Sequence, residues 1–239
     1  MQLSKRLAAV AAFVSYGNRI ADVGTDHGYI PIHLVKNNIC PKAVAMDIRK
    51  GPLQRAQAHI REYGLEDRIE TRLSDGTAAL HSGEADTLVI AGMGGNVMIH
   101  ILEDGYETIK NMNECILQPQ SDIGKFRYYL QQRGYKTVAE DIVLEEDKYY
   151  PIIKVIPEAG LDYNNRIPES TQQIFHLFGQ LLLENRHPVL RQFLDKKLEK
   201  ICKVMTQIQE NADKGKQRLP ELERQKLQIE AALLYFNNK

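Results

Sequence analysis

The stretch from Ile20 to Leu34, IADVGTDHGYIPIHL, places the strongest constraint on what this chain can fold into. Residues 19–23 are predicted to form a short strand, residues 24–28 a turn bounded by glycines, and the residues from Tyr29 onward a helix. Because glycine lacks a Cβ and tolerates positive φ, such a turn lets the backbone approach a ligand closely. In a doubly wound sheet, the first strand-to-helix turn lies where cofactors bind. We therefore expect a cofactor at this turn.

The charges around the turn indicate which cofactor it can hold. The dinucleotide-binding motif Gly-x-Gly-x-x-Gly places its middle glycine against a pyrophosphate. Here Asp26 occupies that position, and Asp22 lies four residues before it. Two carboxylates would repel a pyrophosphate and would favour a ligand with ammonium and sulfonium groups, such as S-adenosylmethionine. The segment resembles motif I of class I methyltransferases, Asp/Glu-x-Gly-x-Gly-x-Gly, with Asp26 replacing the central glycine. A tight turn in another α/β protein is the alternative.

Predicted strands and helices alternate along most of the chain. A helix over residues 3–15 precedes the first strand; its Lys5 and Arg6 could contact RNA or could be solvated. Further strands are predicted over residues 42–46, 68–73, 86–91 and 114–117, and helices over residues 51–63, 96–102 and 123–132. Residues 137–144 and 149–156 flank an acidic turn and predict an antiparallel hairpin. The alternation predicts an α/β fold with a Rossmann-like sheet of the class I methyltransferase type.

Two acids follow predicted strands and complete the expected cofactor site. Asp47 lies 23 residues after Gly24, near the ~20 expected for a carboxylate that binds ribose hydroxyls. The turn Ser74-Asp75-Gly76 resembles the methyltransferase position whose acid or amide binds adenine, although a simple turn or helix cap is the alternative for Asp75. The residues expected to bind the cofactor are Asp22, Gly24, Thr25, Gly28, Asp47, Ile48, Asp75, Gly76, Ala91 and Gly92.

The segment Gly92-Met-Gly-Gly-Asn96, after the fourth strand, is expected to meet the methyl acceptor. It lacks the Asp/Asn-Pro-Pro-Tyr pattern of enzymes that methylate exocyclic amines. Carbon-5 pyrimidine enzymes need a cysteine nucleophile, but Cys115 falls inside a predicted buried strand. Three glycines allow a flat base to approach, and a ring nitrogen with its own lone pair needs only in-line placement against the sulfonium. A tight strand-to-helix connection is the alternative.

Five motifs together resemble the bacterial TrmK family. They are Asp22-Val-Gly-Thr-Asp-His-Gly-Tyr29, Ala45-Met-Asp47, Ser74-Asp-Gly76, Ile90-Ala-Gly-Met-Gly-Gly95 and Leu117-Gln-Pro-Gln120. The resemblance covers the whole chain and implies methyl transfer from S-adenosylmethionine to ring nitrogen 1 of adenine 22 in tRNA. It implies that Tyr29 stacks on the flipped adenine and that Asp26 or Gln118 bonds the adenine amino group. The expected catalytic residues are Asp26, Tyr29, Gly94 and Gln118; those expected to line the acceptor pocket are His27, Met93, Gly95 and Asn96.

The pattern changes after Pro157, which suggests domains over residues 1–157 and 158–239. A linker is predicted from Glu158 to Arg166, followed by helices over residues 171–186, 189–210 and 221–237. Apolar stripes along the last two helices predict an antiparallel coiled-coil hairpin. Four lysines, Lys196, Lys197, Lys200 and Lys203, give the second of these helices a basic side that is expected to bind tRNA. Acids interleave with them, so a solvated helical face is an equally good interpretation.

Composition bounds the partners and the compartment. The formal net charge is zero, which gives no global attraction to nucleic acid. Three widely spaced cysteines fit a reducing compartment and predict neither a disulfide framework nor a zinc site. No apolar run approaches the ~18 residues of a membrane span. We therefore expect a cytoplasmic monomer with no membrane or metal partner. Two alternatives remain: a small-molecule methyltransferase, which would have little need for the helical arm, and a non-catalytic RNA-binding protein with a vestigial methyltransferase fold.

Overall fold

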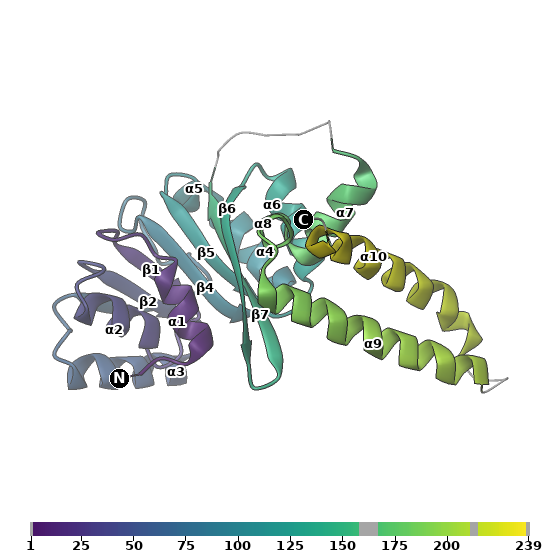
Figure 1. Ribbon diagram of the computed structural model, residues 1–239. Helices are drawn as coiled ribbons and strands as arrows, with labels where there is room; N and C mark the ends of the chain where they lie inside the picture. The colour runs from purple at the N-terminus through teal and green to yellow at the C-terminus, as the bar shows by residue number, and fades with distance from the viewer. Residues whose placement is uncertain (1, 158–166, 211–214, 238–239) are drawn as a thin grey trace. The chain divides into compact units, whose positions relative to one another are not determined.

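Two compact units, residues 1–164 and 165–239, make up the chain in the computed structural model, which describes residues 2–157, 167–210 and 215–237 (Figure 1). The first unit holds a seven-stranded sheet and the second is helical. The linker predicted over residues 158–166 lies outside the described residues. Within those that are described, no helix is both long enough and apolar enough to cross a membrane.

The sheet confirms the predicted Rossmann-like architecture. Its strands are β1 (Ile20–Val23), β2 (Ala43–Asp47), β3 (Ile69–Leu73), β4 (Thr87–Met93), β5 (Glu114–Pro119), β6 (Lys136–Glu145) and β7 (Lys148–Ile156). They lie in the order β3-β2-β1-β4-β5-β7-β6. The first five strands are parallel, whereas β7 is antiparallel to both of its neighbours. The predicted hairpin therefore closes one side of the sheet.

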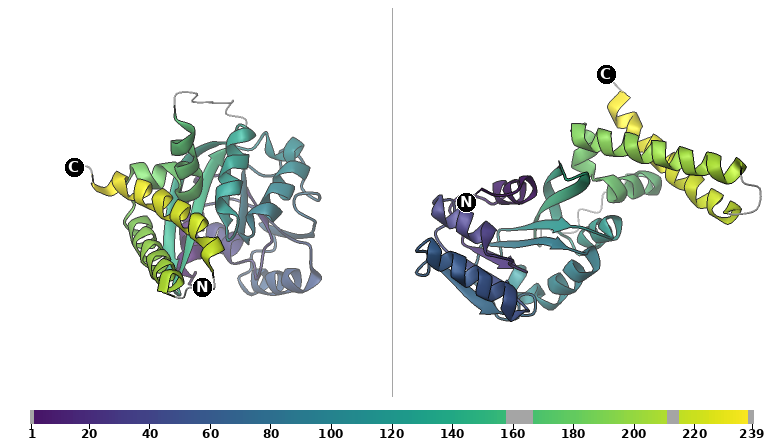
Figure 2. Two further views of the ribbon diagram at one scale, coloured as in Figure 1. Left: turned by 90° about the vertical axis from the view of Figure 1, so that its right-hand side faces the viewer. Right: turned by 90° about the horizontal axis from the view of Figure 1, so that it is seen from below.

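Helices cover both faces of this sheet, which Figure 2 shows as a twisted layer between them. They are α1 (Lys5–Ala12), α2 (Tyr29–Lys36), α3 (Lys50–Glu62), α4 (Gly95–Asp104), α5 (Tyr106–Ile109) and α6 (Ile123–Gln132). One core packs α1, α2 and α3 against the sheet through residues such as Val10, Ile30 and Ile60. The other core packs α4, α5 and α6 through residues such as Met98 and Phe126. With both faces covered, the central strands β1, β2 and β5 are buried at every position.

The antiparallel strand β7 sets where the hairpin lies. Leu117 of β5 pairs with Ile153, and Cys115 pairs with Val155, so β7 runs back from the C-terminal edge of the parallel strands. The β6–β7 turn therefore lies at that edge, beside the start of α1. The Lys5 ammonium donates to the carbonyl oxygen of Leu144 at 3.2 Å, which ties the two elements together.

Strands β4 and β5 continue beyond their predicted C-terminal ends, and this changes the expected acceptor turn. Strand β4 continues through Met93, with a register shift between Ala91 and Met93 that accommodates Gly92 at φ +83°. Strand β5 continues through Pro119, so Gln118 lies within the strand. The predicted turn over residues 92–96 is wrong in extent, because Gly94 alone separates β4 from α4. The short helix α5 is an element that the sequence analysis does not predict.

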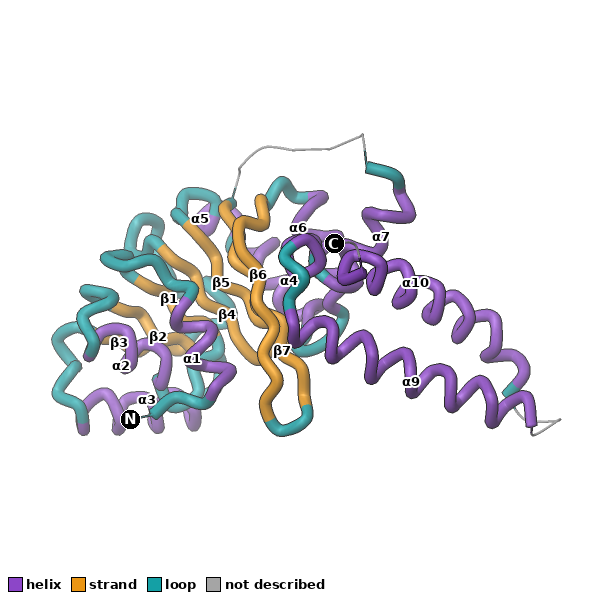
Figure 3. Tube along the Cα trace, in the orientation of Figure 1, coloured by secondary structure: helices purple, strands orange, loops and turns teal. Residues whose placement is uncertain are grey.

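The helical unit contains α7 (Glu169–Phe178), α8 (Gln180–Glu184), α9 (Pro188–Glu210), a short 3₁₀ helix (Lys216–Arg218) and α10 (Leu219–Asn237). The predicted single helix over residues 171–186 is wrong, because Gly179, at φ +90°, separates α7 from α8. The long helices α9 and α10 lie side by side (Figure 3). Their buried residues are Leu190, Leu194, Ile201 and Ile208 on α9, and Leu222, Ile229 and Ala232 on α10. The finer coiled-coil geometry stays a prediction.

Candidate active site

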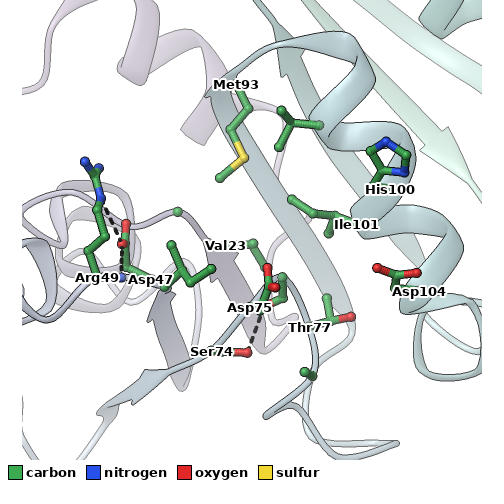
Figure 4. A pocket seen from close by; sticks show the side chains of 15 residues that line it. Val23, Asp47, Arg49, Ser74, Asp75, Thr77, Met93, His100, Ile101 and Asp104 are labelled. Atoms are coloured by element: carbon green, nitrogen blue, oxygen red, sulfur yellow. Dashed lines mark hydrogen bonds and ion pairs between the residues drawn. The ribbon is translucent and has the colours of Figure 1, made fainter.

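A cavity of about 580 Å³ opens beside the C-terminal ends of β1, β2, β3 and β4 (Figure 4). This volume is typical of sites for small molecules and cofactors. Five residues that the sequence predicts for the cofactor lie in its lining: Gly24, Asp47, Ile48, Asp75 and Gly76. The remaining lining residues are Val23, Arg49, Ser74, Thr77, Ala78, Met93, Val97, His100, Ile101 and Asp104. The strand ends thus converge on one site as expected.

Asp47 is held in a defined orientation at the end of β2. Its side chain is almost completely buried, yet it lines the cavity. Its Oδ1 accepts the backbone N–H of Arg49 at 2.7 Å, and the guanidinium Nε of Arg49 lies 3.7 Å away. A carboxylate fixed in this way is ready to accept further hydrogen bonds from a ligand inside the cavity.

Asp22 is a second buried carboxyl group, one strand away on β1. Burial raises the pKa of Asp22 from 3.8 to about 6, and the nearby Asp47 carboxylate acts in the same direction. The turn after it is fixed because the backbone N–H groups of Gly24 and Thr25 both donate to the carbonyl oxygen of Met46 at 2.8 Å. The Asp22 carboxyl is therefore held next to the turn in an environment that disfavours its charge without a cationic partner.

The Met93 side chain packs directly against Gly24 in the lining of the cavity. A Cβ added to Gly24 would lie 2.0 Å from Cε of Met93, and Gly24 adopts φ +78°. Only glycine allows this contact and this backbone conformation together. The Met93 side chain points into the cavity (Figure 4). Met93 is predicted to meet the substrate; in the structure it lines this cavity, and its role stays a prediction.

Helix α4 contributes a wall that the sequence analysis missed. Its four lining residues, Val97, His100, Ile101 and Asp104, follow the i, i+3, i+4, i+7 spacing of one helix face. Ile101 also sits 3.3 Å from where a Cβ of Gly76 would stand, so the third-strand turn packs tightly against α4. The helical spacing is visible in the sequence, but the direction in which that face points depends on how α4 packs.

Residues that follow β1 form a stack of rings with a residue of α3. The ring centroids of His27 and Tyr29 are 5.1 Å apart, and His59 stacks on both at 5.3 and 5.6 Å. His27 adopts φ +64°, and its carbonyl oxygen lies 3.0 Å from Nδ1 of His59. Asp26 is largely exposed, and its Oδ1 accepts from the Arg55 guanidinium at 2.8 Å. Arg55 and His59 contact residues of this turn in the structure, although nothing in the sequence spacing links them to it.

Two further residues of this turn that are predicted to bind the cofactor are buried in the structure. A Cβ on Gly28 would lie 3.3 Å from Cβ of Ala56, so this glycine, at φ +68°, allows α2 to begin close to α3. Thr25 is buried.

The glycines after β4 serve the join between α4 and the segment that follows β5. A Cβ on Gly95 would lie 2.7 Å from the carbonyl oxygen of Ser121, and one on Gly94 would lie 2.9 Å from its Oγ. The Asn96 amide donates to Asp122 at 3.0 Å and accepts from Lys125 at 2.7 Å. Gly95 and Asn96 are predicted to line the acceptor pocket. In the structure both contact the protein segment that follows β5.

Gln118 contacts a residue that the sequence analysis does not connect to it. It is completely buried, its Oε1 accepts from Nη1 of Arg6 at 2.9 Å, and its Nε2 donates to the carbonyl oxygen of Pro119 at 3.1 Å. The predicted bond from Gln118 to an adenine amino group stays a prediction; in the structure the amide group is engaged by Arg6 and by the backbone. Arg6 also lies over the ring of Tyr150, at 5.5 Å from its centroid.

Comparison with known proteins identifies the family. Residues 3–153 match the model of a methyltransferase domain. A Bacillus subtilis tRNA (adenine(22)-N(1))-methyltransferase is 33% identical over 224 residues, which cover 93% of each chain. The crystal structure of the B. subtilis m1A22 tRNA methyltransferase TrmK matches with a TM-score of 0.82 at 31% identity, over 97% of this chain and 99% of that one. The chain belongs to the TrmK family.

A second solved structure similar to this TrmK-family chain contains a ligand. It is a Streptococcus pneumoniae protein in complex with S-adenosyl-L-methionine, 32% identical, with a TM-score of 0.82 over 97% of this chain and all of that one. Among the residues that the structure describes, no group of three or more His, Cys, Asp or Glu side chains is arranged to hold a metal ion.

The four lysines of helix α9 do not share one environment. The Lys197 ammonium lies over the rings of Phe193 and Phe178, at 5.4 and 5.9 Å from their centroids, and burial lowers its pKa. Lys203 pairs with Glu199 at 2.5 Å. Lys196 and Lys200 are exposed. In this TrmK-family chain, Lys196, Lys197 and Lys200 are all exposed on α9, whereas Lys203 is paired with Glu199.

Proposed function

We propose that this protein transfers a methyl group from S-adenosylmethionine to ring nitrogen 1 of adenine 22 in tRNA. The observation that carries the proposal is a pair of buried carboxyl groups, Asp22 and Asp47, beside a glycine turn in a chain of the TrmK family. The relatives that cover nearly the whole chain carry this activity in their names.

The cavity fits the proposed cofactor in size and in chemistry. Asp47 would accept from the two ribose hydroxyls, and Asp75 with Gly76 would hold the adenine. The buried Asp22 would pair with the ammonium group of the methionine part, which removes the cost of burying its charge. When bound, the cofactor supplies the methyl group on its sulfonium.

The acceptor chemistry places few demands on the protein. Nitrogen 1 of adenine carries its own lone pair, so the site must orient the base rather than remove a proton first. Tyr29, held in its stack by His27 and His59, would provide a flat surface for the flipped adenine. Asp26 would accept from the adenine amino group through the carboxylate that Arg55 orients. Gly94 would leave space beside the methyl group, and the N6 proton of the product can leave to water.

Mapping the methylated nucleosides in tRNA tests the function directly. We expect 1-methyladenosine at position 22 after incubation with S-adenosylmethionine, and none in a matched transcript that carries guanine at that position. Transfer of label to a metabolite pool instead of tRNA would support the small-molecule alternative. Binding of tRNA without binding of S-adenosylmethionine would support the non-catalytic alternative. We further propose that the protein acts as a monomer in the cytoplasm, which sedimentation and cell fractionation can test.

Replacing Asp47 should weaken the cofactor strongly. In Asp47→Ala, S-adenosylmethionine loses charge-assisted hydrogen bonds worth about 1.5–3 kcal/mol, so its Kd rises by roughly 10- to 100-fold. Isothermal calorimetry measures this change, with NAD as a ligand that should not bind the wild type. The exposed Asp67→Ala variant is the matched control and should bind normally. An unchanged Kd in Asp47→Ala would remove this carboxylate from the cofactor site.

Cofactor affinity should depend on pH through Asp22. Because its pKa is raised to about 6, Asp22 is largely neutral at pH 5 and must lose a proton to pair with the ammonium group. The Kd for S-adenosylmethionine should therefore fall as the pH rises from 5 to 7, by at most about tenfold per unit, and then level off.

The stability of the protein without bound cofactor should also depend on Asp22. Its free energy of unfolding should fall as the pH rises from about 4 to 6, because the buried carboxyl group ionises in the folded state. Calorimetry across this range should show no such trend in Asp22→Asn.

A further inference from the structure

Arg6 lies at the C-terminal edge of the parallel strands, near the ends of β4 and β5. It lies in the first turn of α1, and its Nη1 donates to Gln118, the buried side chain near the end of β5. The same nitrogen is 3.5 Å from where a Cβ of Gly92 would stand. Tyr150 of β7 supports the guanidinium through its ring. Three strands thus fix one arginine beside the bulge at which β4 ends.

The guanidinium of Arg6 differs in its charge balance from those of Arg19, Arg72 and Arg127. Arg19 pairs with Asp86 at 2.7 Å, Arg72 with Glu84 at 2.6 Å, and Arg127 with Glu140 at 2.8 Å. Arg6 is half-buried, but within the described residues no carboxylate pairs with its guanidinium. The nearby carboxylate of Glu145 instead accepts from the backbone N–H of Arg6 at 3.4 Å.

A half-buried guanidinium that is held in one orientation and has no carboxylate partner can bind an anion through its remaining N–H groups. Gln118 engages one of its five N–H donors, so a planar fork remains for two oxygens of an oxyanion. We propose that Arg6 binds a phosphate of the RNA backbone beside the target nucleotide, with Gln118 and Tyr150 as its positioning residues. The proposal rests on the proposed function.

Two observations favour a phosphate over the other groups that could reach this place. The cofactor cavity is lined from β1 through α4, whereas Arg6, Gln118 and Tyr150 lie around β5 and β7, so the cofactor carboxylate is the less suitable anion. Methylation of adenine at nitrogen 1 creates a cationic base, which a guanidinium at the base edge would oppose. A guanidinium on the phosphate fixes the flipped nucleotide without opposing that charge.

Substitutions of Arg6 by methionine and by lysine separate the effect of its positive charge from the effect of its planar guanidinium group. In Arg6→Met, which keeps the aliphatic stem, kcat/KM for tRNA should fall by about 10- to 100-fold, mostly through KM, as expected for a charged hydrogen bond. The slope of log Kd for tRNA against log salt should become shallower by about 0.7–0.9, the contribution of one phosphate. Arg6→Lys should restore the salt slope but only part of kcat/KM, because lysine lacks the fork. The Kd for S-adenosylmethionine should stay within about twofold.

Two further variants serve as controls, one for the loss of any arginine and one for misfolding of Arg6→Met. Arg133→Met removes an exposed arginine at the C-terminal end of α6 and should leave tRNA kinetics unchanged. Gln118→Glu keeps the buried shape but places a carboxylate on the Arg6 guanidinium, and it should mimic Arg6→Met even if that variant fails to fold.

Three results would overturn the assignment. The first is an unchanged kcat/KM in Gln118→Glu, and the second is an unchanged salt slope in a folded Arg6→Met. The third is a weakened affinity of Arg6→Met for S-adenosylmethionine together with normal tRNA binding, which would assign Arg6 to the cofactor. If the wild type does not methylate position 22, the proposed function fails before these variants are compared.

Discussion

In the chain shortened to residues 1–157, S-adenosylmethionine should bind with its normal Kd, while tRNA affinity falls by about 100-fold or more because several phosphates are no longer bound. The first expectation follows from packing, because the cores on both faces of the sheet consist of residues from the first unit alone. The second follows from the absence of predicted catalytic residues in the helical unit and from the exposed Lys196 and Lys200 on α9. Calorimetry and filter binding measure the two affinities.

Charge reversal separates tRNA binding from a purely structural role of the helical unit. Changing Lys196 and Lys200 to glutamate in the full chain should weaken tRNA binding and flatten the salt slope by about 0.7–0.9 for each phosphate that these lysines neutralise. Lys197 is left unchanged because its ammonium lies over two aromatic rings within the unit. Normal tRNA affinity in the shortened chain would refute a tRNA-binding role. Aggregation of the shortened chain, or a change in the number of subunits in sedimentation, would instead indicate a stability or dimerisation element.

Gly24→Val should abolish cofactor binding, with a fall in affinity of at least about 100-fold, or ~2.7 kcal/mol. The added Cβ would stand 2.0 Å from Cε of Met93, which forces that side chain further into the cavity. Gly83→Val is the matched control, because Gly83 has φ +79° against +78° for Gly24 and nothing within 4 Å of its added Cβ. Both variants should lose about 1–2 kcal/mol of stability from left-handed backbone strain. If the two bind S-adenosylmethionine equally well, the contact with Met93 does not govern access.

The parts of the fold that depend on local signals could be predicted from the sequence. The glycine-bounded turn after β1 and the acids at the ends of β1 and β2 belong to this class, because parallel strands bring their C-terminal ends to one edge whatever the details of packing. Helix α6 begins and ends where its apolar spacing indicates. Glycine is a weaker signal, because it can either end an element or lie within it. Gly179 separates two helices, whereas Gly92 lies inside strand β4.

The remaining parts of the candidate site depend on contacts between distant residues. Arg55 reaches Asp26 across 29 positions, and Arg6 reaches Gln118 across 112. No periodicity carries such information, since each pair meets only after α1 and α3 have packed on the sheet. The sequence suggests a loop at Gln118 because its neighbours Pro119 and Gln120 are typical of turns. The pairing of β5 with β4 extends one residue beyond Gln118, whose buried side chain accepts a hydrogen bond from Arg6 in the structure.

The reversed direction of β7 also makes residue 157 a convenient attachment point. Because β7 runs antiparallel to β5, the chain leaves the sheet at the edge opposite the cofactor cavity, about 20 Å away by the rise of the six-residue strand β5. In Figure 1 this exit lies at the top of the sheet, whereas the β6–β7 turn lies at the bottom. A fluorophore or an affinity tag joined to the shortened chain at this position would lie away from the cavity, so the first unit can be immobilised or labelled without covering that edge of the sheet.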